Sequence, residues 1–271
     1  MLINRSDNKF LTTQCNVYIS PHEVLNPYIS TYNILFPEKN MLSEKYTIIP
    51  DASGTFSFAY DGKSIKSELW GASSKINVIG SEANNYNFLL LVELKPCGLY
   101  QFTGVNQKEF TDIRIDLEAV NKSLNTSLCN IIEKAIDVND LVNGLNATFL
   151  SHMADVYQIN TMLGLIRKIH NNNGFLHIKE LSFSEHYSER HLNRLFYQYI
   201  GMNVKLFSRI VRINNAIGQM KNLKSSCTLI SQQAGYYDQS HFINDFKEIC
   251  GVPPTQYLKN MSDFSNSIFK P

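Results

Sequence analysis

The last hundred or so residues contain one short pattern twice, and this repeat restricts the fold more than any other feature of the chain. The copies span residues 178–201 and 229–251, about 50 residues apart. Each has an apolar segment, a turn, an N-cap residue (Ser188 or Asp238), a second apolar segment and a terminal glycine. Ser and Asp cap helix N-termini, and glycine accepts the left-handed conformation that follows a helix. Two helix-turn-helix units are therefore predicted.

The second helix of each unit carries apolar residues four positions apart, Leu192 with Phe196 in the first copy and Phe242 with Phe246 in the second. This spacing buries one stripe of a helix and leaves the opposite face polar. In the helix-turn-helix geometry the second helix can enter the major groove of DNA. One copy would be a weak signal, whereas two copies make DNA binding the favoured prediction.

The segment between the copies predicts a long helix. Residues 205–222 contain no proline, and their apolar residues recur at helical spacing. A helix of about 18 residues is about 27 Å long. Such a rod would hold the two second helices in successive major grooves, which recur about every 34 Å along one face of DNA. Part of its apolar surface must also be core.

The first 115 residues are predicted to form mainly strands. Residues 46–49, 55–60 and 87–94 are apolar or alternating runs, and each is closed by turn residues. The pair Asp61-Gly62 predicts a two-residue hairpin turn after the second run.

From about Leu117 the apolar spacing becomes helical. Two antiparallel helices are predicted within residues 124–150. Their apolar stripes pack on the strands or, as the alternative, form a homodimer surface. A third helix, 154–170, is predicted to end at the stop signal formed by residues 171–174.

Two domains are predicted, with a boundary near residue 152. Residues 1–152 form an α+β regulatory or dimerisation domain, rich in strands and ending in the helical pair, and residues 153–271 form an all-α domain with the two helix-turn-helix units. Net charge changes sign between the halves: residues 1–150 hold 12 Lys+Arg and 16 Asp+Glu, and residues 151–271 hold 13 and 8. This asymmetry indicates that the halves face different partners.

Composition favours an ordinary globular protein, with 44% apolar and 18% charged residues. The longest apolar run, residues 88–92, is far shorter than the roughly 20 residues of a bilayer span, so no membrane partner is expected. The first ten residues lack the apolar core of a signal peptide, which predicts a cytoplasmic protein. The five cysteines form no C-x-x-C pair, so reduced thiols are expected rather than a metal site or disulfides.

Residues ~156–263 resemble the DNA-binding domain of AraC/XylS-type regulators, a bacterial-type family. The most specific segment is Ala234-Gly-Tyr-Tyr-Asp-Gln-Ser-His-Phe242, followed by Phe246-Lys247 and Gly251-Val-Pro-Pro254. The chain departs from the family pattern where Asn203-Val204 replaces Ser-Pro, and where Leu258 replaces a basic residue. The resemblance implies two helix-turn-helix units joined by a long helix, and a role in transcription regulation.

The N-terminal half resembles, less closely, an uncharacterised domain that precedes such DNA-binding domains in some regulators. The resemblance lies in residues 27–29, Pro50-Asp51, residues 69–71, residues 94–100 and residues 110–112. It implies no particular ligand.

Side chains with paired donors and acceptors lie on the polar faces of the two second helices. We predict base contacts from Arg190, Asn193, Arg194, Gln239, Ser240, His241 and Asn244. Arginine can form two hydrogen bonds with guanine, and asparagine two with adenine. As alternatives, Arg194 contacts phosphate or pairs with Glu189 or Glu185, Gln239 and Ser240 satisfy first-turn amides, and His241 packs on Tyr237.

Two further groups of candidates follow from charge and aromaticity. Phosphate contacts are predicted for Lys205, Arg209, Arg212 and Lys247, each of which could equally be a solvated surface charge. A ligand pocket among the strands would be lined by Phe56, Phe58, Trp70 and Tyr100, unless these are plain core.

The favoured function is a sequence-specific transcription regulator that reads two adjacent major-groove segments and whose N-terminal half senses a ligand, dimerises, or does both. An enzyme is not expected, because residues 1–150 hold one histidine and neither a phosphate loop nor a G-x-S-x-G elbow. No cofactor is implied.

A protein-interaction module acting through residues 124–150 is the remaining alternative. The partners considered are double-stranded DNA, a small-molecule effector, a second copy of the chain and RNA polymerase.

Overall fold

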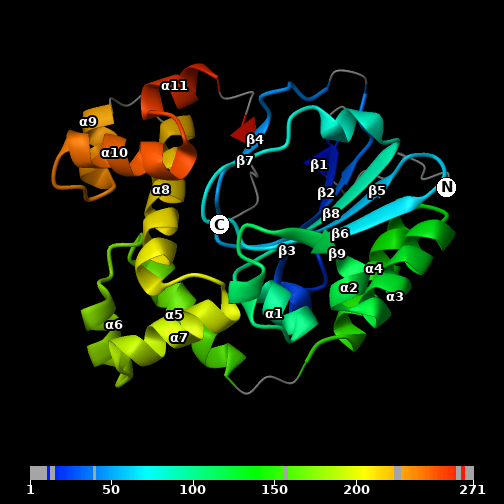
Figure 1. Ribbon diagram of the computed structural model, residues 1–271, viewed down its shortest axis with the longest axis horizontal. Coiled ribbons are helices and arrows are strands. Elements are labelled where there is room, and N and C mark those ends of the chain that lie inside the picture. The colour runs from blue at the N-terminus through cyan, green and yellow to red at the C-terminus, as the bar shows by residue number, and fades with distance from the viewer. Residues whose placement is uncertain are drawn as a thin grey trace.

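The apolar runs of the N-terminal half form an antiparallel sheet of seven strands within the described residues (Figure 1). The computed structural model describes residues 11–12, 16–38, 41–154, 158–222, 227–260 and 264–265. The sheet has the strand order β1-β2-β3-β8-β5-β6-β9. Its strands are β1 (Leu11–Thr12), β2 (Asn16–Ile19), β3 (Ile29–Leu35), β5 (Thr55–Tyr60), β6 (Ile65–Trp70), β8 (Phe88–Leu94) and β9 (Arg114–Asp116). The predicted strands at 55–60 and 87–94 are confirmed as β5 and β8, which pair with each other.

A second, smaller sheet joins distant parts of the chain. Its central strand, β4 (Thr47–Ile48), falls within the strand predicted at 46–49. β4 pairs antiparallel with β7 (Asn77–Val78) and parallel with β10 (Phe264–Ser265). Because β10 comes from the C-terminal end, this sheet ties that end to the N-terminal half.

The turn after β5 is longer than predicted. Four residues connect Tyr60 and Ile65, which are paired across the hairpin. The carboxylate of Asp61 accepts hydrogen bonds from the backbone N–H groups of Lys63 (2.8 Å) and Ser64 (2.9 Å). This aspartate-based turn stabilises the longer loop, so the two-residue prediction was wrong.

The helical pair that follows the strands covers one face of the large sheet (Figure 1). It consists of α3 (Lys122–Lys134) and α4 (Val138–Ser151). Phe149 of α4 stacks on Tyr32 of β3 (ring centroids 6.3 Å apart) and on Phe56 of β5 (6.0 Å). The apolar stripes of the pair are therefore core, and they are not free to form the alternative homodimer surface.

The remaining elements of the N-terminal half are short. They are the helices α1 (Gly98–Thr103) and α2 (Leu117–Val120) and the 3-10 turns η1 (Glu23–Leu25), η2 (Glu82–Asn85) and η3 (Gln107–Glu109).

Segments singled out by the N-terminal resemblance meet in space. A Cβ atom on Gly71 would lie 1.7 Å from the carbonyl oxygen of Phe110, so only glycine fits. The carboxylate of Asp112 accepts hydrogen bonds from the backbone N–H (2.7 Å) and hydroxyl (2.6 Å) of Ser74. These motif residues hold two loops together beside the sheet.

The C-terminal half is helical throughout its regular structure up to residue 260. Its helices are α5 (Ile159–Asn171), α6 (Ile178–Glu185), α7 (Glu189–Tyr199), α8 (Val204–Asn222), α9 (Cys227–Gln233), α10 (Gln239–Cys250) and α11 (Pro254–Lys259). The α+β and all-α halves and the long central helix are thus confirmed. The predicted boundary at residue 152 falls between α4 and α5, beside residues 155–157, which lie outside the described residues.

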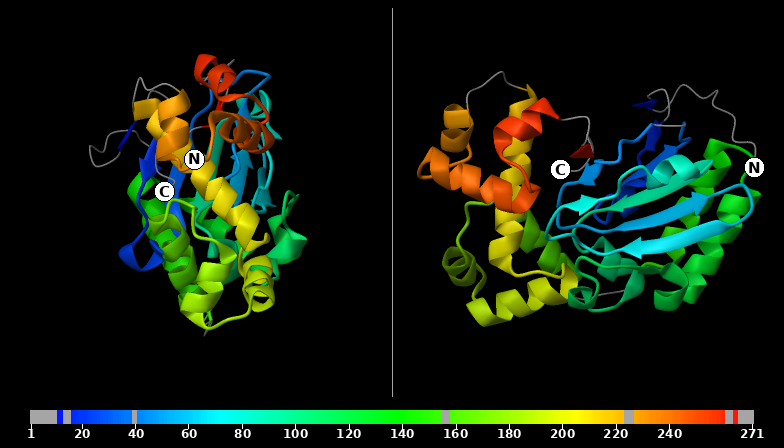
Figure 2. Two further views of the ribbon diagram at one scale, coloured as in Figure 1. Left: turned by 90° about the vertical axis from the view of Figure 1, so that its left-hand side faces the viewer. Right: turned by 45° about the horizontal axis from the view of Figure 1, so that its top comes forward.

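The two halves are in direct contact, and the right-hand view of Figure 2 shows them side by side. The hydroxyl of Thr111 donates a hydrogen bond to the carbonyl of Gly201 (2.7 Å). The rings of Tyr100 and Tyr199 lie 4.3 Å apart. Burial is the main reason that the pKa of Tyr199 rises to about 12, so its hydroxyl is neutral in this contact. Most buried apolar residues of both halves form one continuous cluster, and Leu35, Ala59 and Leu89 form a separate one.

Within the described residues, no helix is long and apolar enough to cross a membrane. Cys97 and Cys250 are buried free thiols and Cys129 is a half-buried one. Cys15, the Cys227 side chain and the first ten residues lie outside what the structure describes.

Candidate nucleic-acid interface

The first helix-turn-helix unit consists of α6 and α7. The hydroxyl of Ser188 accepts a hydrogen bond from the backbone N–H of His191 (3.2 Å) at the start of α7. Gly201, with φ +97°, closes the end of the helix. The predicted cap and terminal glycine are therefore confirmed.

The second unit, α9 and α10, repeats this arrangement. The carboxylate of Asp238 accepts a hydrogen bond from the backbone N–H of His241 (2.7 Å). Gly251 ends α10 with φ +72° and donates a hydrogen bond to the carbonyl of Lys247 (2.9 Å). Both second helices thus start and stop where the sequence predicts.

The long helix α8 connects the two units, which lie towards its opposite ends (Figure 1). It spans 19 residues, which corresponds to a length of about 28 Å at 1.5 Å per residue. This length is close to the repeat of the major groove, about 34 Å.

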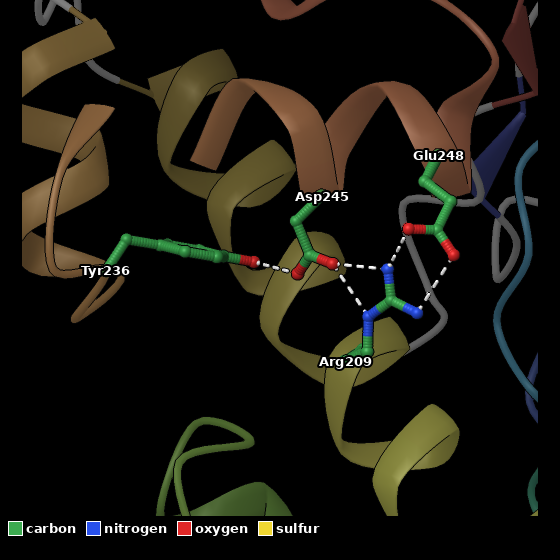
Figure 3. A network of polar contacts seen from close by, with 4 residues as sticks. All are labelled: Arg209, Tyr236, Asp245 and Glu248. Atoms are coloured by element: carbon green, nitrogen blue, oxygen red, sulfur yellow. Dashed lines mark hydrogen bonds and ion pairs between the residues drawn. The ribbon is translucent and has the colours of Figure 1, made fainter. Parts of the chain in front are cut away.

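A partly buried ionic network, with Asp245 buried and Glu248 exposed, links α10 to α8 (Figure 3). Arg209 of α8 donates to Asp245 from Nε (2.7 Å) and to Glu248 from Nη1 (3.1 Å) and Nη2 (2.6 Å). The hydroxyl of Tyr236 donates to the other oxygen of Asp245 (2.7 Å). The hydrogen bonds from Arg209 lower the pKa of Glu248, and those same contacts raise the pKa of Arg209. These contacts hold all four side chains in one arrangement where α10 of the second unit packs on α8.

The predicted base-reading residues of α7 have different environments. Arg190 and Arg194 are exposed, and Nη2 of Arg194 lies 3.3 Å from Nδ1 of His191. Asn193 is half-buried, and its Oδ1 accepts a hydrogen bond from the backbone N–H of Val204 (3.2 Å). Asn193 therefore caps the first turn of α8, which competes with the base contact predicted for it.

The predicted base-reading residues of α10 are all exposed. They are Gln239, Ser240, His241 and Asn244. The ring of His241 stands edge-on to Tyr236, with centroids 5.3 Å apart. The expected packing partner, Tyr237, is instead 97% exposed in the turn before the helix.

The four predicted phosphate contacts divide into two pairs. Lys205 and Lys247 are exposed, as a phosphate contact requires. Arg209 is used by the ionic network, whereas Arg212 lies over the ring of Phe175 (4.6 Å) and donates from Nη2 to the carbonyl of Gly174 (2.9 Å). Because these internal contacts occupy both guanidinium groups, they argue against the phosphate role predicted for the two arginines.

Sequence reasoning missed the network around Asp245. This aspartate lies between Phe242 and Phe246, on the buried stripe of α10, and is itself only 6% exposed. A charged residue on a buried stripe requires a partner. That position was the available signal, although the partner on α8 could not be named from it.

The predicted pocket residues do not converge. Phe56 and Phe58 are fully buried in the core between the large sheet and α3–α4. Tyr100 packs at the contact between the halves. Trp70 lies on the opposite face of the sheet, where it lines a cavity. The aromatic set predicted for one pocket is therefore divided among three places. Strand alternation separates Phe56 and Phe58 from Trp70.

Comparison with known protein families matches residues 181–260 to a family described as a helix-turn-helix domain. This region is a helix-turn-helix domain of the AraC type. The matched residues begin within α6 and run to the end of α11, so they cover nearly all of both units.

Relatives of the helix-turn-helix domain are transcription regulators. An uncharacterised HTH-type transcriptional regulator of Haemophilus influenzae is 28% identical over 138 residues, which cover 51% of this chain and 44% of that protein. The F1 operon positive regulatory protein of Yersinia pestis is 29% identical over 99 residues, 36% of this chain and 33% of that protein. The chain thus spans less than half the length of these curated relatives.

Solved structures show fainter likeness. The C-terminal domain of AraT, a response regulator from Geobacillus stearothermophilus, is 21% identical, with a TM-score of 0.32, and the match covers 35% of this chain and 84% of that one. ToxT from Vibrio cholerae O395 is 12% identical, with a TM-score of 0.42, and the match covers 84% and 96%. ToxT of the same species with an unsaturated fatty acid bound is 14% identical, with a TM-score of 0.41, covering 94% and 97%.

Proposed function

We propose that this protein regulates transcription by binding a specific DNA sequence through α7 and α10. The observation that carries the proposal is the pair of capped second helices, each with an exposed polar face, joined by a single helix of nearly one groove repeat. The family match and the regulator relatives support it.

Specificity would come from exposed side chains on the two second helices. Arg190 and Arg194 of α7, with Ser240 and Asn244 of α10, carry the groups suited to base edges. Asn193, Gln239 and His241 are retained as candidates, although Asn193 is also a cap. Lys205 and Lys247 would contact phosphates, which set affinity and salt dependence rather than sequence preference.

The rigid connection between the units makes a geometric test available. A binding site is first selected from random DNA with the full-length protein, and its two half-sites are then moved apart. Because α8 and the Arg209 network fix the separation of α7 and α10, an insertion of about 5 bp should rotate one half-site to the opposite face of the duplex and remove its contribution. Affinity is measured by fluorescence anisotropy at fixed salt concentration.

Restoring the helical phase with about 10 inserted base pairs should not restore affinity, since one α8 cannot span two groove repeats. Equal affinity for the original and the 5-bp site would contradict a fixed pair of reading helices. A sequence with both half-sites scrambled is the control, and it reports the non-specific component.

The N-terminal half is proposed to regulate the DNA-binding half. Its direct contacts with α7 and α8 support this role, because a change in the sheet domain has a path to both units. The predicted dimerisation through 124–150 lacks its original support, since the apolar stripes of α3 and α4 are core. Analytical ultracentrifugation of the full chain, with and without DNA, would show whether another surface makes a dimer.

A further inference from the structure

A cavity of about 130 Å³ lies on the face of the large sheet opposite α3 and α4. Its floor is made by side chains of β2, β3, β5, β6 and β8 that alternate with the core residues of the same strands. Tyr46, Ile48, Ile79 and the turn η2 lie over this floor. The cavity thus lies between the sheet and the β4–β7 segment and is partly open to solvent.

The charged side chains that line the cavity are all acidic. Glu68, Glu82 and Glu93 line it, and the described lining includes no lysine, arginine or histidine. Two cations stand beside it: Lys66 pairs with Glu68 (3.0 Å) and Glu82 (3.8 Å), and Arg114 pairs with Glu82 (3.5 Å). Glu93 lies deepest of the three, at 7% exposure.

Two of these carboxylates, Glu68 and Glu93, already accept hydrogen bonds from side chains of the floor. Nε1 of Trp70 donates to Glu68 (3.2 Å), and Nδ2 of Asn33 donates to Glu93 (3.2 Å). Asn33 is only 6% exposed, and its Oδ1 has no hydrogen-bond partner within the part of the chain that the structure describes. A buried acceptor without a partner is costly, so a group that donates to Oδ1 would be stabilised there. The floor thus has a buried acceptor, Oδ1 of Asn33, that lacks a donor among the described residues.

Apolar surface completes the cavity. Leu35, Leu89 and Leu91 of the floor and the ring of Trp70 line it. Its volume is close to that of an engineered cavity of about 150 Å³ that binds benzene. A compact apolar body of roughly one six-membered ring therefore fits.

From this arrangement we infer that the cavity binds a small primary ammonium compound with a compact apolar body. The ammonium group would donate to Glu93 and to Oδ1 of Asn33, and the body would pack against Trp70 and the leucines. A carboxylate-bearing ligand is disfavoured because it would meet acceptors of its own charge. No group of three or more His, Cys, Asp or Glu in the described residues is placed to hold a metal ion, so an organic cation suits the cavity better than a metal ion.

The segment over the cavity also contacts the DNA-binding half. Two residues after Ile48, the carbonyl of Pro50 accepts a hydrogen bond from Nδ2 of Asn214 on α8 (2.9 Å). Ile76, directly before β7, packs on Gly251 at the end of α10. The contact is so close that a Cβ added to Gly251 would lie 2.4 Å from Cδ1 of Ile76. A ligand under β4 and β7 would thus act on α8 and α10. This last step rests on the proposed function, whereas binding itself does not.

Binding is tested with three probes of similar size, benzylamine, benzyl alcohol and benzoate, by isothermal titration calorimetry on the full-length protein. Benzylamine, which is cationic at neutral pH, should bind saturably and roughly tenfold or more tightly than benzyl alcohol, as expected for a hydrogen bond with a charged partner. Benzoate should give no binding. Equal affinities of the amine and the alcohol, or no saturable binding of the amine at millimolar concentration, would overturn the inference.

Two variants locate the site. Glu93→Gln keeps the shape and removes the charge, and it should weaken benzylamine binding by about tenfold or more while benzyl alcohol is unaffected. Ala83, on η2, is a half-exposed residue of the cavity lining. Ala83→Leu fills part of the cavity, so it should weaken the binding of both benzylamine and benzyl alcohol. Glu133→Gln, on the exposed face of α3, is the matched control. Far-UV circular dichroism confirms folding, and wild-type affinity in both cavity variants would place the amine elsewhere.

DNA affinity is measured separately, with and without benzylamine. If benzylamine binds with the expected selectivity and the protein binds no specific DNA, the ligand site stands and the proposed function fails. If the protein binds DNA specifically and benzylamine gives no heat, the proposed function stands and the ligand site fails.

Discussion

At the scale of single residues, the most unusual feature is the ionic network of Arg209, Tyr236, Asp245 and Glu248. It places a charged side chain, Asp245, on the buried stripe of α10. Asp245 is taken out of water and the Arg209 guanidinium is mostly so, whereas Glu248 stays exposed at the junction of α8 and α10. Replacing such a group by apolar residues is often neutral for stability, but removing one partner leaves an uncompensated charge. The network therefore fixes how α10 is oriented on α8, in addition to any stability that it provides.

Arg209→Met should lower the free energy of unfolding by about 3 kcal/mol, because the buried Asp245 loses its cation. Lys205→Met, on the exposed surface of the same helix, should change it by less than about 0.5 kcal/mol. Chemical denaturation of the two variants checks this. A loss below about 1 kcal/mol for Arg209→Met would show that the pair is solvated like a surface salt bridge.

Arg194→Ala should cost about 1–3 kcal/mol of DNA binding and relax the preference at one base pair of the selected site. Arg167→Ala, an exposed arginine on α5, is the control and should leave the preference unchanged. A panel of single-base substitutions measured by anisotropy separates the outcomes. If Arg194→Ala weakens every sequence equally, Arg194 contacts phosphate.

At the scale of elements, each second helix is defined by local chemistry at its ends. Ser188 and Asp238 cap the first turns, and Gly201 and Gly251 close the last. These signals act within a few residues along the chain, which is why α7 and α10 were predictable to within a residue. Asn193 shows the limit of such local signals. It lies on α7 but caps the first turn of the next helix, α8, through the N–H of Val204.

Asp238→Ala should lower the free energy of unfolding by about 1 kcal/mol, because the N–H of His241 loses its acceptor. Asp238→Asn keeps a side-chain oxygen in place and should cost much less. Thermal unfolding followed by circular dichroism compares the two. Equal effects would mean that the charge of Asp238, and not its hydrogen bond, stabilises α10.

The packing of α5 on α8 should make stability depend on pH. His170 faces Phe207 edge-on (5.8 Å), and burial lowers its pKa below the ordinary 6.5. Below pH 6.5 the unfolded chain then binds more protons than the folded one, so stability falls as pH drops from 6.5 towards the folded pKa. His170→Phe should flatten that part of the profile. The free energy of unfolding is measured by urea titration at several pH values in this range. If its dependence on pH is the same in His170→Phe as in the wild type, His170 is not the source.

At the scale of the whole molecule, the halves share apolar burial and specific hydrogen bonds. Linked domains usually move relative to each other unless their interface is large and hydrophobic. Here the first unit is held at Thr111 and Tyr100, and α8 is held at Pro50. The sheet domain is thus placed to restrict how both reading helices approach DNA.

Gly201→Ala should weaken this contact. The added Cβ would lie 2.4 Å from Oγ1 of Thr111 and 2.9 Å from the carbonyl oxygen of Gln107, and the residue would keep φ +97°. A strained backbone of this kind costs about 1–3 kcal/mol. Hydrogen exchange should rise in η3 and at the end of α7. Gly164→Ala on α5, where a Cβ meets open space, is the control and should not raise exchange.

The sequence by itself determined the elements whose signals are local. Alternation marked β5 and β8, and caps, terminal glycines and four-residue spacing marked the two helix-turn-helix units. Even the long rod between them followed from eighteen residues without proline. Each of these features depends on backbone propensity and on side chains a few positions apart, which any stretch of chain carries with it.

Only the tertiary structure decided which surfaces are available. Arg209 and Arg212 look like phosphate contacts until partners 38 or 39 residues away occupy them. Phe56 and Trp70 belong to neighbouring strands, but the pleat sends one into the core and the other into an acidic cavity. Burial and electrostatic pairing arise between residues distant in sequence, so they exist only once the chain has folded.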